Sequence, residues 1–253
     1  GQPAKFYASS NGGIGWQETF HETNPKAFFD AFSFWDNQHG IGFSDPLRDH
    51  LLLVRTNNGG QNWQRVSQQQ SPLTEKGEAG FAASGTCLAT FGESLVWIGL
   101  GGTRSDNENA RVVFSADRGS TWSSAVTPIR RGPSQGIFSL VFVSAKHGVA
   151  VGGDYKAPDE AVHNVAITRD GGLSWRMPSG KPPSGFRSVV TFYQHNNRIT
   201  LVASGRNGTD VSHDLGENWK RVSDLGFQVA AFSADSKLGI GVGRDGMIGR
   251  WVE

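Results

Sequence analysis

An eight-residue pattern recurs five times along this chain and constrains the fold more than any other feature. The pattern is Ser or Thr, any residue, Asp or Asn, any residue, Gly, two further residues and Trp. The copies end at Trp16, Trp63, Trp122, Trp175 and Trp219, so successive tryptophans lie 47, 59, 53 and 44 residues apart. Spacings of this length indicate a fold built from repeated supersecondary units.

The residue types in each copy predict a tight hairpin turn. The Asp or Asn side chain accepts hydrogen bonds from backbone N–H groups a few residues further on. The glycine supplies a positive φ without steric cost, and the tryptophan brings a large apolar surface to the next strand. A metal site would need several carboxylates on one loop, and two copies carry an amide instead. We therefore predict structural turns, with no metal, at Asn11, Asn58, Asp117, Asp170 and Asp214.

Strand-length segments bounded by Gly, Pro, Asn and Asp fill the sequence between the turns. Each full unit has room for four strands, which is the blade of a β-propeller. We therefore predict a single all-β propeller domain over residues 1–253, built from four-stranded antiparallel blades. Complete blades are expected near residues 27–68, 80–127, 135–178 and 185–223, with partial blades at 1–22 and 227–253. The partial blades do not add up to one blade, so we expect the native chain to continue upstream.

Composition limits the partners of such a chain. The net charge is +1 and basic residues form no run, so neither nucleic acid nor an anionic membrane surface is a predicted partner. No apolar segment reaches the roughly 18 residues of a membrane-spanning helix, so no membrane insertion is predicted. The single cysteine, Cys87, lies in a run of small residues from Gly80 to Leu88, which predicts a buried inner strand and an inert thiol.

The repeated turn resembles the Asp-box, or BNR repeat, of sialidases, sortilin-type receptors and Ycf48-like photosystem II assembly factors. Four further stretches resemble bacterial Ycf48-like proteins, namely residues 27–32, 43–46, 77–87 and 149–155. The resemblance implies a propeller, with about seven blades in the relatives, in which the turn marks architecture and not activity. It also implies that a site lies on the face opposite the turns.

The loops on that opposite face carry the candidate partner-binding residues. They join second to third strands or lead into first strands, and they are chemically varied. The candidates are Asp30, Asp45, Arg48, Glu78, Asp154, Tyr155, Lys156, Arg187, Arg206 and Arg244. A further loop of this kind runs from Gly101 to Asn109. We expect a rim with a basic sector (Lys156, Arg187, Arg206, Arg244) and an acidic sector (Asp30, Asp45, Glu78, Asp154).

Two functions from different classes remain open. The first is a non-catalytic binding or assembly scaffold that presents the loop face to a protein or peptide partner. The second is a sialidase-like glycoside hydrolase or glycan-binding propeller. Hydrolysis would need paired carboxylates, for which the candidates are Asp45 with Glu78 or Asp154 with Glu78, and a sialidase tyrosine could come only from Tyr7, Tyr155 or Tyr193.

Cofactor and location follow from what the sequence contains. It has no dinucleotide-binding glycine motif and no cysteine cluster, so no cofactor is predicted. One cysteine suits a cytoplasmic or a periplasmic protein, and we favour a periplasmic or otherwise exported bacterial protein.

Overall fold

The computed structural model describes residues 3–102, 109–233, 235 and 238–252, and it is all-β apart from two short 3₁₀ turns. The 3₁₀ turns are η1 (Gln68–Gln70) and η2 (Arg244–Gly246). Among these residues, no helix is long and apolar enough to cross a membrane. The predicted fold class is confirmed.

In the part of the chain that the structure describes, twenty strands form six antiparallel sheets in chain order. The first is a two-stranded hairpin of β1 (Ala4–Ala8) and β2 (Gln17–Glu22). The second contains β3 (Phe29–Phe34), β4 (Gly40–Leu47), β5 (His50–Thr56) and β6 (Gln64–Arg65). The third contains β7 (Leu88–Phe91), β8 (Leu95–Gly99), β9 (Asn109–Ser115) and β10 (Ser123–Arg130).

The C-terminal half continues the series. The fourth sheet contains β11 (Gln135–Phe142), β12 (Gly148–Asp154) and β13 (Val165–Thr168). The fifth contains β14 (Val189–His195), β15 (Arg198–Gly205), β16 (Gly208–Ser212) and β17 (Lys220–Ser223). The sixth contains β18 (Val229–Phe232), β19 (Gly239–Val242) and β20 (Ile248–Arg250).

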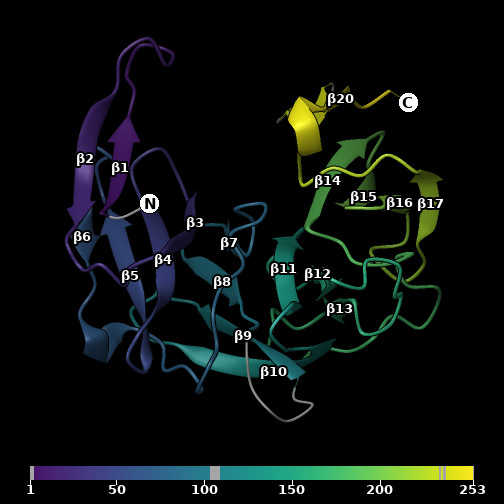
Figure 1. Cartoon of the computed structure of the whole chain (residues 1–253), viewed down its shortest axis with the longest axis horizontal. Coiled ribbons are helices and arrows are strands. Elements are labelled where there is room, and N and C mark those ends of the chain that lie inside the picture. The colour runs from purple at the N-terminus through teal and green to yellow at the C-terminus, as the bar shows by residue number, and fades with distance from the viewer. Residues whose placement is uncertain (1–2, 103–108, 234, 236–237, 253) are drawn as a thin grey trace.

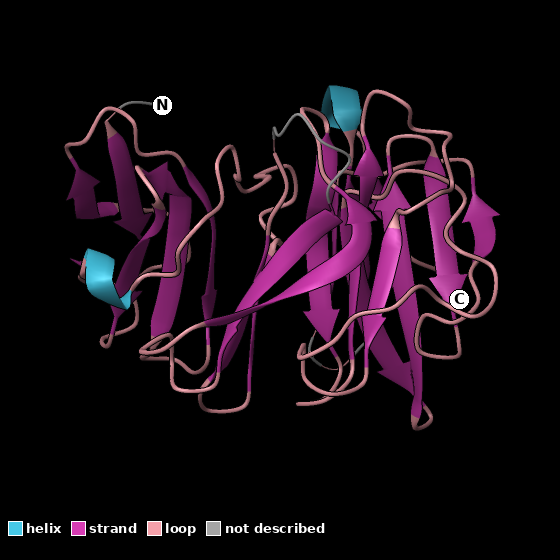
Figure 2. Cartoon of the chain, turned by 90° about the horizontal axis from the view of Figure 1, so that it is seen from below, coloured by secondary structure: helices cyan, strands magenta, loops and turns pink. Residues whose placement is uncertain are grey.

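The sheets follow one another around an arc, with their first strands side by side at the inside. β3 contacts β7, β7 contacts β11, β11 contacts β14, and β14 contacts β18. The hairpin β1–β2 and the sheet β18–β20 lie at opposite ends of this arc in both views (Figures 1 and 2). Four-stranded meanders arranged around a common centre are the blades of a β-propeller.

Apolar side chains between neighbouring sheets form the core. One cluster joins β4 and β5 to β8 through Ile41, Leu53 and Ile98, each of which is buried. The next cluster contains Trp97, whose ring stacks on Phe142 of the following sheet at 3.5 Å and 10°. The core therefore consists of apolar layers, each packed between two neighbouring sheets.

Two details differ from the predicted blades. The segment after Trp175 contributes one bridge, Ile167 to Arg176, in place of a full fourth strand, because three prolines between residues 178 and 183 cannot donate to a ladder. The run from Gly80 to Leu88 was predicted to be an inner strand. It is irregular up to β7, with Gly85 at φ +67°, because a local Ser84–Thr86 hydrogen bond of 2.6 Å favours a turn.

The repeated turn closes on itself through the same hydrogen bonds in each copy. In residues 168–175, the Thr168 hydroxyl oxygen accepts the Gly172 N–H at 2.9 Å and donates to the Asp170 carboxylate at 2.8 Å. The same carboxylate accepts the Ser174 N–H at 3.0 Å and the Ser174 hydroxyl at 2.5 Å. Equivalent bonds recur at the other four copies. The Asp and Asn side chains are therefore committed to the turn.

The turn tryptophans differ in how far they are buried. Trp219 is 2% exposed, Trp63 and Trp175 are each 9% exposed, and Trp122 packs partly buried against an inter-sheet cluster. Trp16 has the same indole-to-carbonyl hydrogen bond within its turn, 2.9 Å to Gly13, but is 64% exposed. Four tryptophans therefore anchor the turn to a neighbouring sheet, and Trp16 does not.

Candidate functional site on the loop face

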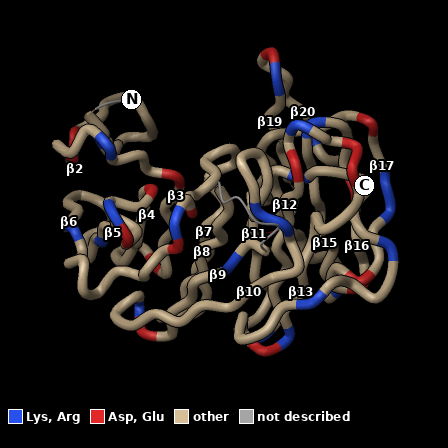
Figure 3. The backbone as a smooth tube through the Cα atoms, turned by 60° about the horizontal axis from the view of Figure 1, so that its bottom comes forward, with Lys and Arg blue, Asp and Glu red and all other residues tan. Residues whose placement is uncertain are grey.

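The loop face carries the connections β4–β5, β12–β13, β15–β16 and β19–β20, at the opposite strand ends from the repeated turns. The β4–β5 connection is the two-residue turn Arg48–Asp49, with Arg48 at φ +70°. Most of the predicted loop 101–109 lies outside the described residues. Acidic and basic residues are interspersed over the molecule, with no continuous band of one sign (Figure 3).

A pocket of about 580 Å³ opens on this face between β4–β5 and the segment that precedes β7. It brings together three of the predicted residues, Asp45, Arg48 and Glu78. The other lining residues are Lys26, Pro46, Asp49, Thr74, Glu75, Lys76, Gly77 and Ala79. We refer to it as the loop-face pocket.

Two carboxylates of this pocket belong to a structural ion-pair network. Glu78, whose side chain is 0% exposed, accepts two bonds from Arg111, at 2.8 and 2.7 Å, and one of 3.1 Å from Arg131. Arg131 also donates to Glu75 at 2.8 Å. The hydrogen bond to Glu78 raises the pKa of Arg111. The network fastens the segment before β7 to β9 and to the end of β10, so Glu78 is already paired.

Asp30 is buried next to Asp45, which is half-buried and lines the pocket. Asp30 is 6% exposed, and neither of its carboxyl oxygens has a hydrogen-bond partner among the described residues. Burial, and then the charge of Asp45, raise the pKa of Asp30 to about 8. Burial also raises the pKa of Asp45, although the Gly80 N–H donates to it at 2.9 Å. Asp30 therefore carries a proton at neutral pH.

Three cations around the pocket have no such partner. Lys26, Arg48 and Lys76 are exposed, and none of them forms an ion pair with any residue that the structure describes. The remaining acid, Asp49, accepts hydrogen bonds from His50 at 2.8 Å and from Gln68 at 3.0 Å. The pocket therefore has three exposed cations without an ion-pair partner among the described residues. The carboxyl groups beside them are paired, hydrogen-bonded or protonated.

Asp154, Tyr155 and Lys156 lie together after β12. Asp154 accepts the Gln135 amide at 3.0 Å and the Lys156 N–H at 2.8 Å. Tyr155 is 37% exposed, and its ring is T-shaped to that of Phe138, with 6.1 Å between the ring centroids. Lys156 is exposed. This group forms a second polar patch on the loop face beside an aromatic cluster.

Arg187 lies in the interior and not on the rim where the sequence predicted it. It is 0% exposed and forms an ion pair with Asp210, itself 1% exposed. Its other N–H groups donate to the Phe186 carbonyl at 2.7 Å and to Asn207 at 2.9 Å. The basic sector is thus reduced to Lys156, Arg206 and Arg244, which are exposed. The acidic sector is altered too, because Asp30 and Glu78 are buried.

Sequence reasoning missed Lys26, Lys76, Arg111, Arg131 and Asp210. Arg111 and Arg131 lie 33 and 53 residues from Glu78, and Asp210 lies 23 residues from Arg187. No local spacing signals such pairs. The sequence offered one general signal. An Asp, Glu or Arg near a strand end becomes buried only when another side chain pairs with its charge.

Metal and thiol chemistry have little support in the geometry. Within the described ranges, no group of three or more His, Cys, Asp or Glu side chains is placed to hold a metal ion. Cys87 is fully buried, and burial raises the pKa of its thiol.

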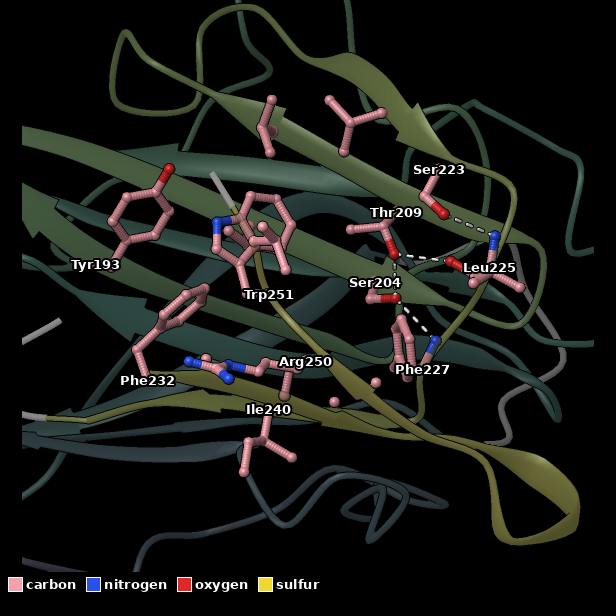
Figure 4. Close-up of a pocket in the computed structure, with 18 of the residues that line it drawn as sticks. Tyr193, Ser204, Thr209, Ser223, Leu225, Phe227, Phe232, Ile240, Arg250 and Trp251 are labelled. Carbon is pink, nitrogen blue, oxygen red and sulfur yellow. Dashed lines mark hydrogen bonds between the residues drawn. The ribbon is translucent and has the colours of Figure 1, made fainter. Parts of the chain in front are cut away.

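A second pocket, of about 510 Å³, lies between sheet β14–β17 and sheet β18–β20. Its walls are largely apolar and include Tyr193, Phe232 and Trp251 (Figure 4). Ser204 and Thr209 line one end, where they are hydrogen-bonded to each other at 2.8 Å. We refer to it as the inter-sheet pocket.

Comparison with known proteins gives similarity of fold. No family model matches the chain. No curated protein matches it either. A structure of YCF48 bound to D1 peptide is 16% identical with a TM-score of 0.56, over 89% of this chain and 63% of that one. The chain therefore spans less than two thirds of that structure.

Two other solved structures are similar at the same level. An ancestral GH74 enzyme is 15% identical with a TM-score of 0.58, over 94% of this chain and 32% of that one. A triple-arginine mutant of AofleA from Arthrobotrys oligospora is 12% identical with a TM-score of 0.55, over 94% of this chain and 73% of that one. At these identities the comparisons show the propeller-type fold, which hosts unrelated functions.

Proposed function

We propose that this chain is an Asp-box propeller that acts as a non-catalytic binding scaffold and takes an acidic polypeptide segment on its loop face. The observation that carries the proposal is the charge state of the loop-face pocket. Lys26, Arg48 and Lys76 have no ion-pair partner in the described structure, whereas Glu78 is paired with two arginines. Cations without partners are the groups that a carboxylate-bearing ligand can pair with.

The same geometry supports binding over hydrolysis. A glycosidase needs one carboxyl group that delivers a proton and a second that stays ionised beside the reacting bond. Both carboxyl oxygens of Glu78 already accept bonds from Arg111 and Arg131, so this side chain is held in the structural network and does not face a ligand freely. The raised pKa of Asp30 favours its protonated form, but this side chain is buried and does not line the pocket. The solved YCF48 structure contains a peptide, which agrees with a polypeptide ligand on a similar fold.

The test is titration of a fluorescein-labelled oligoglutamate peptide, followed by fluorescence anisotropy. The variant Lys26→Ala/Arg48→Ala/Lys76→Ala should weaken binding about tenfold or more, because charge-assisted hydrogen bonds are lost. Binding of the wild type should also weaken as salt is raised, since exposed charges are screened beyond about 8–10 Å.

A matched control removes the same charge elsewhere. The variant Lys146→Ala/Lys181→Ala/Lys220→Ala removes three exposed cations away from the pocket and should bind as the wild type does. Equal weakening by both triple variants would mean a non-specific charge effect and would contradict the proposal. Turnover of a sialoside or another glycoside by the wild type would favour the hydrolase instead.

A further inference from the structure

A pocket of about 610 Å³ lies on the face of the repeated turns, beside the turn that ends at Trp63. Its walls come from the sheet β3–β6 and from Arg118 in the turn of the next sheet. The lining residues are Trp35, His39, Gly40, Arg55, Thr56, Asn57, Asn58, Asn62, Trp63, Gln64 and Arg118. They include two arginines and no acid. We refer to this site as the turn-face pocket, and its volume suits a small molecule.

The first unusual feature of the pocket is the residue directly before the Ser or Thr of the turn. It is Arg55 here, and in the other four copies it is apolar, namely Ala8, Phe114, Ile167 and Val211. Arg55 is half-buried, and its guanidinium donates to the Gly119 carbonyl. Its buried Nε–H has no acceptor, and it forms no ion pair with any described residue. Arg55 is therefore a partly desolvated cation without a counter-ion in contact.

The second unusual feature is Arg118, which lines the pocket from the following turn. The equivalent residue is Leu215 in one copy and glycine in three, namely Gly12, Gly59 and Gly171. Arg118 has φ +58°, a backbone conformation that favours glycine. Its Nε–H donates to the Glu93 carbonyl at 2.6 Å, and its guanidinium lies 5.9 Å from the centre of the Trp35 ring. A second cation is thus fixed at the pocket wall.

The third unusual feature is a set of free side-chain amides. In three copies the side chain before the tryptophan donates to the turn carboxylate, from Thr121, Ser174 and Asn218. At the same position here, the side chain of Asn62 forms no hydrogen bond with any described residue, and only its backbone N–H donates to Asn58. The side-chain amides of Asn57 and Gln64 are unbonded in the same sense. Each amide can both donate and accept a hydrogen bond.

The acids nearest to the pocket already have partners. Asp36 accepts the backbone N–H groups of His39 and Gln38, each at 2.7 Å, and these bonds lower its pKa to about 2. Asp36 also lies 3.6 Å from Arg118. Asp117 is held within its own turn by Thr121. Arg55 is thus the cation of this pocket that a bound anion can neutralise.

We propose that the turn-face pocket binds a small hydroxylated carboxylate, such as a uronic acid. The planar guanidinium of Arg55 pairs with the carboxylate, and the amides of Asn57, Asn62 and Gln64 bond to the hydroxyl groups. A neutral sugar leaves Arg55 without a counter-ion, and a simple anion leaves the amides unbonded. The site lies on the opposite face from the loop-face pocket and does not depend on it.

The test is a titration with glucuronate followed by tryptophan fluorescence, because Trp35 and Trp63 line the pocket. The wild type should show saturable binding, and glucose and acetate should each bind about tenfold more weakly or worse, since each lacks one half of the ligand. Arg55→Ile should weaken glucuronate binding about tenfold or more. Isoleucine occupies this position at Ile167, so the variant should keep the circular dichroism spectrum of the wild type.

A second variant and a matched control make the result specific. Asn62→Ala retains the backbone bond to Asn58 and should weaken glucuronate binding about threefold or more. Arg198→Ala removes an exposed arginine from the β14–β15 connection on the same face and should bind as the wild type does.

The outcomes are separable from those of the loop-face pocket, because Arg55→Ile should bind oligoglutamate as the wild type does. A wild type that shows no saturable binding of glucuronate would overturn the proposal. So would glucose binding as tight as glucuronate binding, or unchanged glucuronate affinity in folded Arg55→Ile.

Discussion

The two faces of this propeller satisfy their polar groups in opposite ways. On the turn face, Thr168, Asp170 and Ser174 satisfy one another within one eight-residue segment, and the same bonds recur in the other copies. On the loop face, Glu78 finds Arg111 and Arg131 far along the chain. The first kind of chemistry repeats because it closes a turn. The second kind does not repeat from sheet to sheet, and among the described residues it leaves Lys26, Arg48 and Lys76 without an ion-pair partner.

The largest expected effect comes from breaking a long-range pair beneath the loop face. Asp210→Ala should destabilise the fold by about 3–5 kcal/mol, because it leaves the buried Arg187 guanidinium without its counter-ion. Urea unfolding followed by tryptophan fluorescence measures the change. Replacing both partners, as in Arg187→Met/Asp210→Leu, should recover most of the loss. A single variant as stable as the wild type would mean that the pair is not buried.

The turn tryptophans test whether the repeated turn stabilises through packing. Trp219→Ala should cost about 3–5 kcal/mol, because a buried ring leaves a cavity between sheets. Trp16→Ala should cost less than about 0.5 kcal/mol, since that ring is exposed. Urea unfolding followed by circular dichroism gives the two free energies of unfolding. Similar losses at both positions would show that burial of the ring between sheets is not what stabilises the turn.

The turn carboxylates give a smaller effect with a defined pH dependence. Asp170→Ala should cost about 1–2 kcal/mol through lost hydrogen bonds. At Asp117, partial burial opposes ionisation, but bonds from Thr121 and Ser115 outweigh it and lower the pKa to about 2. Because the folded pKa is the lower one, this stabilisation is present above the ordinary pKa of about 4 and is lost as pH falls toward 2. Thermal unfolding of Asp117→Asn should lack that part of the acid dependence.

An effect with the opposite pH dependence is expected at Asp30. Its folded pKa of about 8 lies above the unfolded value, so its contribution to stability is full below pH 4 and is lost as pH rises from about 4 to 8. Asp30→Asn keeps the shape of the protonated acid without that loss. The variant should melt about 2 °C or more above the wild type at pH 8, and no higher at pH 4. An equal shift at both pH values would assign the effect to packing.

The sequence alone determined the fold class and the turn chemistry, because both depend on interactions within a few residues. The five Gly-x-x-Trp copies fixed the positions of the hairpins, and strand-length segments between them fixed an all-β propeller. The Asp and Asn side chains of these copies accept the backbone hydrogen bonds within their own turns. Where local chemistry competed with the repeat, as at Ser84 and Thr86, the predicted strand was wrong.

Tertiary structure alone decided which charged residues of the loop face are exposed and which are buried in ion pairs. Arg187 and Arg206 look alike in the sequence, yet one is buried against Asp210 and the other is exposed. Lys26 and Lys76 gave no signal, and they line the pocket because the segments before β3 and β7 converge there. The physical reason is that an ionic side chain acquires its role from a partner that the fold brings beside it, and these partners lie 23 to 53 residues away in the sequence. Local patterns do not specify which partner each charge will meet.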